Sequence, residues 1–148
     1  MIFPDYRPRR LRQSDALRRM IRETLVTAND LILPLFAVSG KGVKNPIPSM
    51  PGQHQLSIDN LIRTAKRAFD LGIPAIMLFG VPDRKDARGT QAYAQSGIVQ
   101  TAVQSVKDAL PDLVVITDVC LCQYTDHGHC GVVVGDTIDN DASLELIA

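Results

Sequence analysis

Three short apolar runs, separated by polar loops and helical patterns, constrain the fold more than any other feature of this chain. The runs are residues 30–38 ("DLILPLFAV"), 74–80 ("PAIMLFG") and 113–119 ("LVVITDV"). An uninterrupted apolar run of strand length is typical of a strand that is buried on both faces of a parallel sheet. Pro34 favours a strand end or a bulge in the first run, because proline cannot donate a ladder hydrogen bond.

Apolar residues recur at helical spacing in the stretches between these runs. Ser14 and Ser57 are suited to cap the first two helices, and Gly72 and Pro111 are suited to end the second and third. The three apolar stripes are Leu17, Met20, Ile21 and Leu25; Ile58, Leu61, Ile62, Ala65 and Phe69; and Ile98, Ala102, Val106 and Leu110. A fourth helical pattern covers residues 140–148. Strands that alternate with amphipathic helices predict an α/β fold of about three parallel βα units.

The bulk composition indicates one globular domain that lies in a reducing compartment. The chain has 148 residues, of which 45% are hydrophobic, and its formal net charge is zero. No apolar run approaches the roughly 20 residues of a membrane span, and the first ten residues do not resemble a secretory signal. Three cysteines are an odd number for a disulfide framework. We therefore expect a cytoplasmic protein without disulfides and with no membrane partner.

Clustered arginines mark the N-terminal region, and we expect residues 1–13 to form an extended arm before a domain of residues 14–148. The arginines are Arg7, Arg9, Arg10, Arg12, Arg18, Arg19 and Arg22. No aromatic residues alternate with them, so we expect no nucleic acid partner. Two interpretations stay open: a solvated arm, and an arm that pairs with acidic groups of a neighbouring subunit.

All three cysteines lie in one segment, "DVCLCQYTDHGHCG", which covers residues 118–131. In an extended segment Cys120 and Cys122 point to the same side, and the following loop is long enough to bring Cys130 to them. Three converging thiolates suit Zn²⁺, whereas calcium and magnesium prefer oxygen ligands. His127 or His129 could close a four-ligand structural site. A catalytic zinc site, a structural zinc site and free thiols are therefore the three alternatives.

The position of this segment favours catalysis. It begins where the third predicted strand ends, and parallel α/β sheets and barrels bind their ligands at the carboxyl ends of the strands. Asp118 is one of few charged residues near these apolar runs. Its carboxylate is a candidate general base or an anchor for an ammonium group, and the simpler alternative is a carboxylate that caps the loop.

The cysteine segment closely resembles the metal-binding segment of the zinc-dependent porphobilinogen synthases, also called delta-aminolevulinate dehydratases. The motifs "RPRRLR", "LILPLF", "PAIMLFGVPDRKD" and "DNDASLELIA" resemble the same family, so the resemblance covers the whole chain. It implies the N-terminal part of a TIM (α/β)8 barrel. It also implies an enzyme that condenses two 5-aminolevulinate molecules to porphobilinogen, with loss of water, in tetrapyrrole biosynthesis.

The resemblance also implies site residues and partners. Cys120, Cys122 and Cys130 match the ligands of the family's zinc ion, and Asp118 matches an active-site carboxylate. The arginine-rich arm matches the segment through which family members embrace their neighbours in homo-octamers. A second, activating magnesium ion is compatible with the full-length enzyme.

One departure from the family concerns lysine. The family forms Schiff bases through two lysines on later barrel strands, and none of Lys41, Lys44, Lys66, Lys85 and Lys107 matches either motif. A barrel of this kind needs about 250 residues. We therefore expect an incomplete barrel that stops at the start of a helix and is inactive alone. The alternative is a non-enzymatic zinc-binding module that derives from the enzyme.

Overall fold

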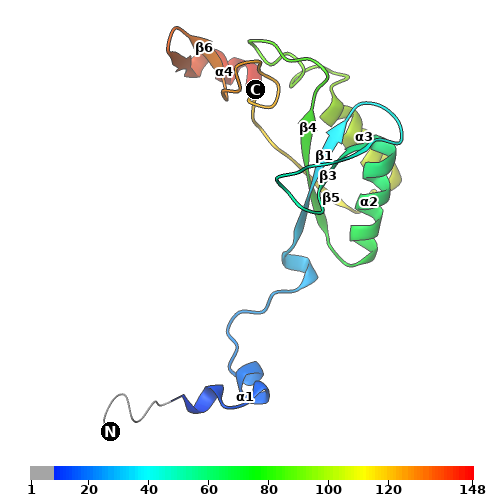
Figure 1. The fold of residues 1–148 in the computed structure, drawn as a ribbon, viewed down its shortest axis with the longest axis vertical. Coiled ribbons are helices and arrows are strands. Elements are labelled where there is room, and N and C mark those ends of the chain that lie inside the picture. Colours follow the sequence, from blue (N-terminus) through cyan, green and yellow to red (C-terminus); the bar gives the residue numbers. More distant parts are fainter. Residues whose placement is uncertain (1–8) are drawn as a thin grey trace.

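The computed structural model describes residues 9–148, and Figure 1 shows the arrangement of its elements. The helical elements are η1 (Arg10–Arg12), α1 (Asp15–Met20), η2 (Ala28–Asp30), α2 (Ile58–Asp70), α3 (Ile98–Ala109) and α4 (Asn140–Ile147). The strands are β1 (Ile32–Val38), β2 (Lys44–Pro46), β3 (His54–Ser57), β4 (Ala75–Val81), β5 (Val114–Thr117), β6 (Val132–Val134) and β7 (Thr137–Asp139). No helix in this range is long and apolar enough to cross a membrane.

The main sheet has five strands in the order β2-β3-β1-β4-β5. The strands β3, β1, β4 and β5 are parallel, and β2 is antiparallel to β3. This arrangement confirms the predicted α/β class with a parallel sheet, and the three predicted strands are β1, β4 and β5. The described part of the chain does not close into a barrel.

Pro34 lies inside β1 and not at its end, although β1 is the central strand of the sheet. The strand β4 pairs with all of β1, from Ile32 to Val38, whereas β3 pairs only with Phe36 to Val38. At Pro34 the described sheet therefore has one neighbouring strand instead of two. A proline is tolerated there because no ladder on the β3 side requires its missing N–H.

The helices α2 and α3 cover one face of the sheet and enclose the core (Figure 1). Leu35 and Leu78 from the sheet are buried against Leu61 of α2 and Val106 of α3. The opposite face is only half-buried, which differs from the prediction of strands buried on both faces. Its side chains include Phe36 and Phe79. Their rings stack at 5.3 Å between centroids, so each ring shields part of the other from solvent on this face.

The first helix is shorter than its apolar pattern predicts. Ser14 caps it as expected, because its Oγ accepts a hydrogen bond from the Leu17 N–H at 3.2 Å. The helix ends at Met20, and Met20 and Leu25 are 81% and 68% exposed. Figure 1 shows α1 far from the sheet, so no packing stabilises a longer helix. Residues 1–8 of the predicted arm lie outside the described residues, and the division at residue 14 stays a prediction.

Two hairpins lie in segments that the sequence predicted as loops. The strands β2 and β3 form one, and β6 and β7 form the other. The helix α4 follows β7, and its cap is Asp139, whose carboxylate accepts from the Ala142 N–H at 3.1 Å. The fourth predicted helix is therefore present, with its cap one residue before Asn140.

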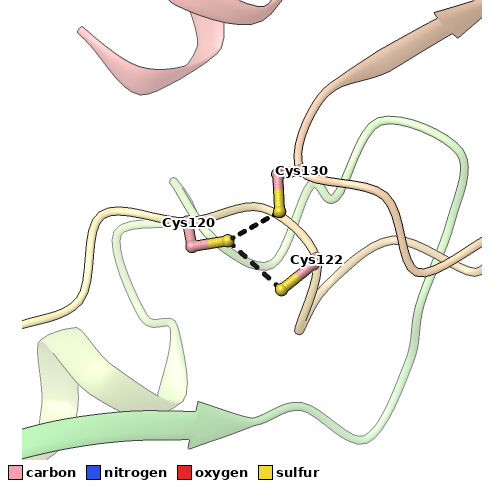
Figure 2. A group of neighbouring side chains, drawn as sticks. All are labelled: Cys120, Cys122 and Cys130. Carbon is pink, nitrogen blue, oxygen red and sulfur yellow. Dashed lines mark hydrogen bonds between the residues drawn. The ribbon is translucent and has the colours of Figure 1, made fainter. Parts of the chain in front are cut away.

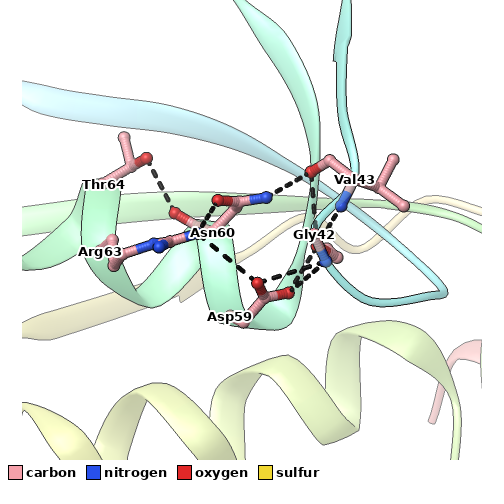
Figure 3. Close-up of polar contacts among 7 residues, drawn as sticks. Gly42, Val43, Asp59, Asn60, Arg63 and Thr64 are labelled. Atoms are coloured by element: carbon pink, nitrogen blue, oxygen red, sulfur yellow. Dashed lines mark hydrogen bonds and ion pairs between the residues drawn. The ribbon is translucent and has the colours of Figure 1, made fainter.

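A polar network fastens the loop after β1 to the start of α2 (Figure 3). Ser57 precedes this helix, as predicted, but its side chain does not cap it. The Ser57 hydroxyl instead donates to Asp59 Oδ1 at 2.6 Å and accepts from the Val43 N–H at 2.8 Å. The Asp59 carboxylate also accepts from the Gly42 N–H at 3.1 Å. The hydrogen bond from Ser57, and then that from Gly42, lowers the pKa of Asp59.

Replacement of Asp59 by asparagine is expected to destabilise the fold in a pH-dependent manner. A carboxyl group whose pKa is lowered by folding stabilises the native state above its ordinary pKa, and this contribution is lost as the pH falls through the lowered value. Urea unfolding should therefore show a loss of stability for Asp59→Asn at about pH 7 that shrinks towards about pH 3. Asp112→Asn is the control, because Asp112 is exposed. A pH-independent loss would contradict this role of Asp59.

Candidate metal centre

The cysteine segment lies at the carboxyl edge of the parallel strands, where the sequence predicted it. The strand β5 ends at Thr117, and the segment begins directly at Asp118. The loop of residues 82–97, which follows β4, lies at the same edge and contacts the cysteine segment through an isolated parallel bridge between Asp86 and Thr125. Two loops from neighbouring strands therefore build the site together.

The three cysteine sulfurs converge on one point (Figure 2). The Sγ atoms of Cys120, Cys122 and Cys130 all lie within 4.8 Å of one another. The distance from Cys120 Sγ is 3.2 Å to Cys122 Sγ and 3.3 Å to Cys130 Sγ. All three thiols are free, and Cys130 is exposed whereas the other two are half-buried. The structure thus brings together the residues that the spacing selected, with access from solvent on the Cys130 side.

The hydrogen bonds among the sulfurs shift the pKa values of the three thiols in different directions. Burial opposes ionisation of Cys120, but hydrogen bonds from the Cys122 backbone and from the two other thiols outweigh it and lower the pKa of Cys120. The hydrogen bond with Cys120, followed by burial, raises the pKa of Cys122 to about 12. The hydrogen bond with Cys120 also raises the pKa of Cys130. A bound cation replaces such protons, because metals bind the thiolate form.

The two histidines of the segment do not join the sulfur cluster. His127 Nδ1 accepts a hydrogen bond from the His129 backbone N–H at 3.1 Å, and His127 Nε2 lies 3.2 Å from the Ala87 carbonyl oxygen. The ring of His129 stacks on that of His127 at 5.5 Å. Among residues 9–148, the cluster contains the three cysteines and no histidine. A tetrahedral ion held by these three sulfurs would keep one position open.

A cavity of about 550 Å³ adjoins the cluster, and Asp118, Cys120 and Tyr124 are among its lining residues. The exposed Asp118 carboxylate accepts a hydrogen bond from the Gln123 amide. Tyr124 is buried, and burial, with the negative charges of Asp118 and Cys120, raises its pKa. Asp118 therefore lines the same cavity as Cys120 of the cluster, together with Tyr124, a residue that the sequence analysis did not single out.

Gly80 near the end of β4 provides the space for Tyr124. A Cβ atom at this position would overlap with the Tyr124 hydroxyl and would lie 2.7 Å from Val99 Cγ2. A glycine inside a strand often marks such a close approach. Gly80 is therefore a sequence signal that some group approaches β4 closely at this position. It does not show that this group is Tyr124.

The comparisons with known proteins agree on one family. The family model described as "Delta-aminolevulinic acid dehydratase" matches residues 5–148. The chain belongs to the delta-aminolevulinic acid dehydratase family. Relatives of that name from Synechocystis and Bacillus subtilis are 56% and 49% identical to it over 99% and 96% of the chain. The chain spans about half of their length, 46% and 44% respectively.

A solved structure of the same family has the same fold. It is the delta-aminolevulinic acid dehydratase (porphobilinogen synthase) of Toxoplasma gondii in complex with porphobilinogen. The two chains are 37% identical, with a TM-score of 0.90, and the match covers 96% of this chain and 41% of the solved one. This match and the named relatives confirm the predicted family, its class of lyase enzymes and its link to porphyrin biosynthesis.

Gly80→Ala is expected to destabilise the chain by about 1–3 kcal/mol, the usual cost of overpacking a filled site. Tyr124→Phe in the same chain should recover part of this loss, because it removes the hydroxyl that the new methyl group meets. Urea unfolding of both single variants and the double variant gives the coupling energy. Equal losses for Gly80→Ala with and without Tyr124→Phe would show that the two residues do not meet.

Proposed function

We propose that this chain provides the metal-binding part of a porphobilinogen synthase, which condenses two 5-aminolevulinate molecules into porphobilinogen with loss of water. The cluster of three cysteine sulfurs beside a cavity, in a chain of this family, is the observation that carries the proposal. The Toxoplasma gondii relative was solved with porphobilinogen, which supports a ligand of this chemical class.

The metal of the proposed site is zinc, and Cys120, Cys122 and Cys130 would hold it. Three sulfur donors fit a soft or borderline ion, whereas magnesium and calcium select oxygen ligands. The sulfurs already lie within 4.8 Å of one another, so binding requires little rearrangement of the loop. A zinc ion with three protein ligands keeps one position open and supplies Lewis-acid chemistry there.

Asp118 is the proposed catalytic residue of this chain. Asp118 lines the cavity that Cys120 also lines. A carboxylate in this position can hold the ammonium group of 5-aminolevulinate by a charge-assisted hydrogen bond, or can accept a proton from it. The amide of Gln123 donates to this carboxylate and so restrains its orientation.

The lysines of the chain support the proposal that it is inactive alone. Lys66 pairs with Asp70 on α2 at 3.0 Å, and Lys107 donates to the Leu113 carbonyl oxygen at 3.0 Å. None of the described residues that line the cavity is a lysine. A covalent amine catalyst needs a desolvated or cation-rich pocket at the reacting carbon. We propose that other segments of the enzyme supply the Schiff-base lysines.

The remaining partners follow the family pattern. We propose a cytoplasmic homo-octamer in which the N-terminal arm contacts a neighbouring subunit, and a second, activating magnesium ion is compatible with it. The exposed apolar side chains of Leu11 in the arm, and of Met20 and Leu25 just after it, support a contact of this region, because burial against another subunit would remove them from water.

The zinc proposal is tested by native mass spectrometry and metal titration of the purified chain. One zinc ion per chain is expected, and Cys122→Ser should abolish tight binding because it removes one of three ligands. Asp126→Asn is the control in the same loop, since an oxygen ligand is not part of the proposed site. A wild-type chain that binds no zinc, or Cys122→Ser that binds it equally well, would contradict the proposal.

The activity proposal is tested with 5-aminolevulinate and a colorimetric assay for porphobilinogen. The zinc-loaded chain alone should form no product. The same chain, coexpressed with the remaining part of the Synechocystis relative, should form it, and Asp118→Asn should lower that activity by a factor of about 10²–10⁴. Turnover by the chain alone would contradict the proposal. A protease-resistant zinc-loaded monomer that never supports turnover would favour the alternative of a non-enzymatic zinc module.

A further inference from the structure

The cysteine segment is clamped to the loop that follows β4. The Asp86 N–H donates to the Tyr124 carbonyl oxygen at 3.3 Å, and the Asp126 N–H donates to the Asp86 carbonyl oxygen at 3.2 Å. These two bonds form a short parallel bridge between Asp86 and Thr125 outside both sheets. They fix the backbone of the cysteine segment at a point between Cys122 and Cys130 that belongs to neither sheet.

The partner loop is itself held in shape by the Asp86 side chain. Its carboxylate accepts from the Arg88 N–H at 2.9 Å, from the Thr90 N–H at 3.2 Å and from the Thr90 hydroxyl. These bonds close a turn around Gly89, whose φ of +63° suits glycine. The carbonyl oxygen of Ala87 lies within this turn, so these bonds also restrain its position.

His127 connects that carbonyl group to the residues just before Cys130. Because His127 Nδ1 accepts a hydrogen bond from the His129 N–H, the proton of the neutral ring lies on Nε2. This Nε2–H group donates a hydrogen bond to the Ala87 carbonyl oxygen. On the other side, the hydroxyl of the buried Thr125 donates to the His129 carbonyl oxygen at 2.8 Å. His129 is thus held at its N–H and at its carbonyl oxygen, and Cys130 is the next residue.

We propose that His127 is a positioning residue that presets the Cys130 sulfur for the metal, without touching the metal itself. The inference rests on the proposed zinc site. Cys130 follows Cys120 by ten residues, and an unrestrained loop of this length would lose conformational entropy each time it closed on the ion. The contacts of His127 restrain the loop before the metal arrives, so their loss should weaken metal binding more than it weakens the fold.

The test measures zinc affinity by competition with a chromophoric chelator, and the absorption of the cobalt-loaded chain. His127→Ala should weaken zinc binding by about 10–100-fold, the usual effect of losing a residue that orients a ligand. The sulfur-to-cobalt charge-transfer band should fall from the intensity of three thiolates towards that of two. Circular dichroism should show an unchanged fold.

Two further variants separate the two contacts of the ring. His127→Gln keeps a donor near the Ala87 oxygen, and His127→Asn keeps an acceptor near the His129 N–H, so each should restore part of the affinity. His54→Ala removes an imidazole from β3 of the main sheet and is the matched control, with the zinc affinity of the wild-type chain.

The possible results distinguish this inference from the zinc proposal. A wild-type chain that binds no zinc would overturn both. Wild-type affinity and an unchanged cobalt spectrum in His127→Ala would overturn the inference alone. A loss of affinity in His127→Ala that neither glutamine nor asparagine reduces would also overturn it, because the two hydrogen bonds would then not be the cause.

Discussion

The continuous parallel ladder between β1 and β4 is the constraint on which the rest of the structure depends. The ladder runs from the pair Ile32 and Ala75 to the pair Val38 and Val81. The strand β5 then extends the same sheet beside β4. Because the strands are parallel, the loops that follow β4 and β5 emerge at the same edge. The cysteines, Asp118 and the loop of residues 82–97 meet there for this reason, although α3 separates them in sequence.

The sequence predicted those parts of the fold that show a continuous apolar run or an apolar stripe at helical spacing. The strands β1, β4 and β5 correspond to the three apolar runs, and α2 and α3 have apolar stripes that meet one face of the sheet. The strands β2, β3, β6 and β7 have three or four residues each and lie among glycines and prolines, so no alternation revealed them. The end of α1 at Met20 was also missed, because periodicity does not show whether a stripe finds a partner.

The same distinction holds for the candidate site, where contacts within one segment could be predicted and contacts between two loops could not. The spacing of Cys120, Cys122 and Cys130 is local, so the sequence alone indicated that the sulfurs converge. It left open whether a histidine joins them, and the contacts of His127 with Ala87 and His129 give a reason why it does not. Those contacts, and the approach of Tyr124 to Gly80, depend on two loops that meet in space. No spacing within one segment contains that information.

The proposed function depends on three thiolates that bind one zinc ion and leave a fourth position for a lighter atom. Zinc K-edge X-ray absorption of the loaded chain tests this most directly, because it reports the type and number of the atoms around the ion. The account predicts three sulfur atoms at about 2.3 Å and one oxygen or nitrogen atom at about 2.0–2.2 Å. A shell with no sulfur, or one with oxygen and nitrogen atoms in the majority, would contradict it.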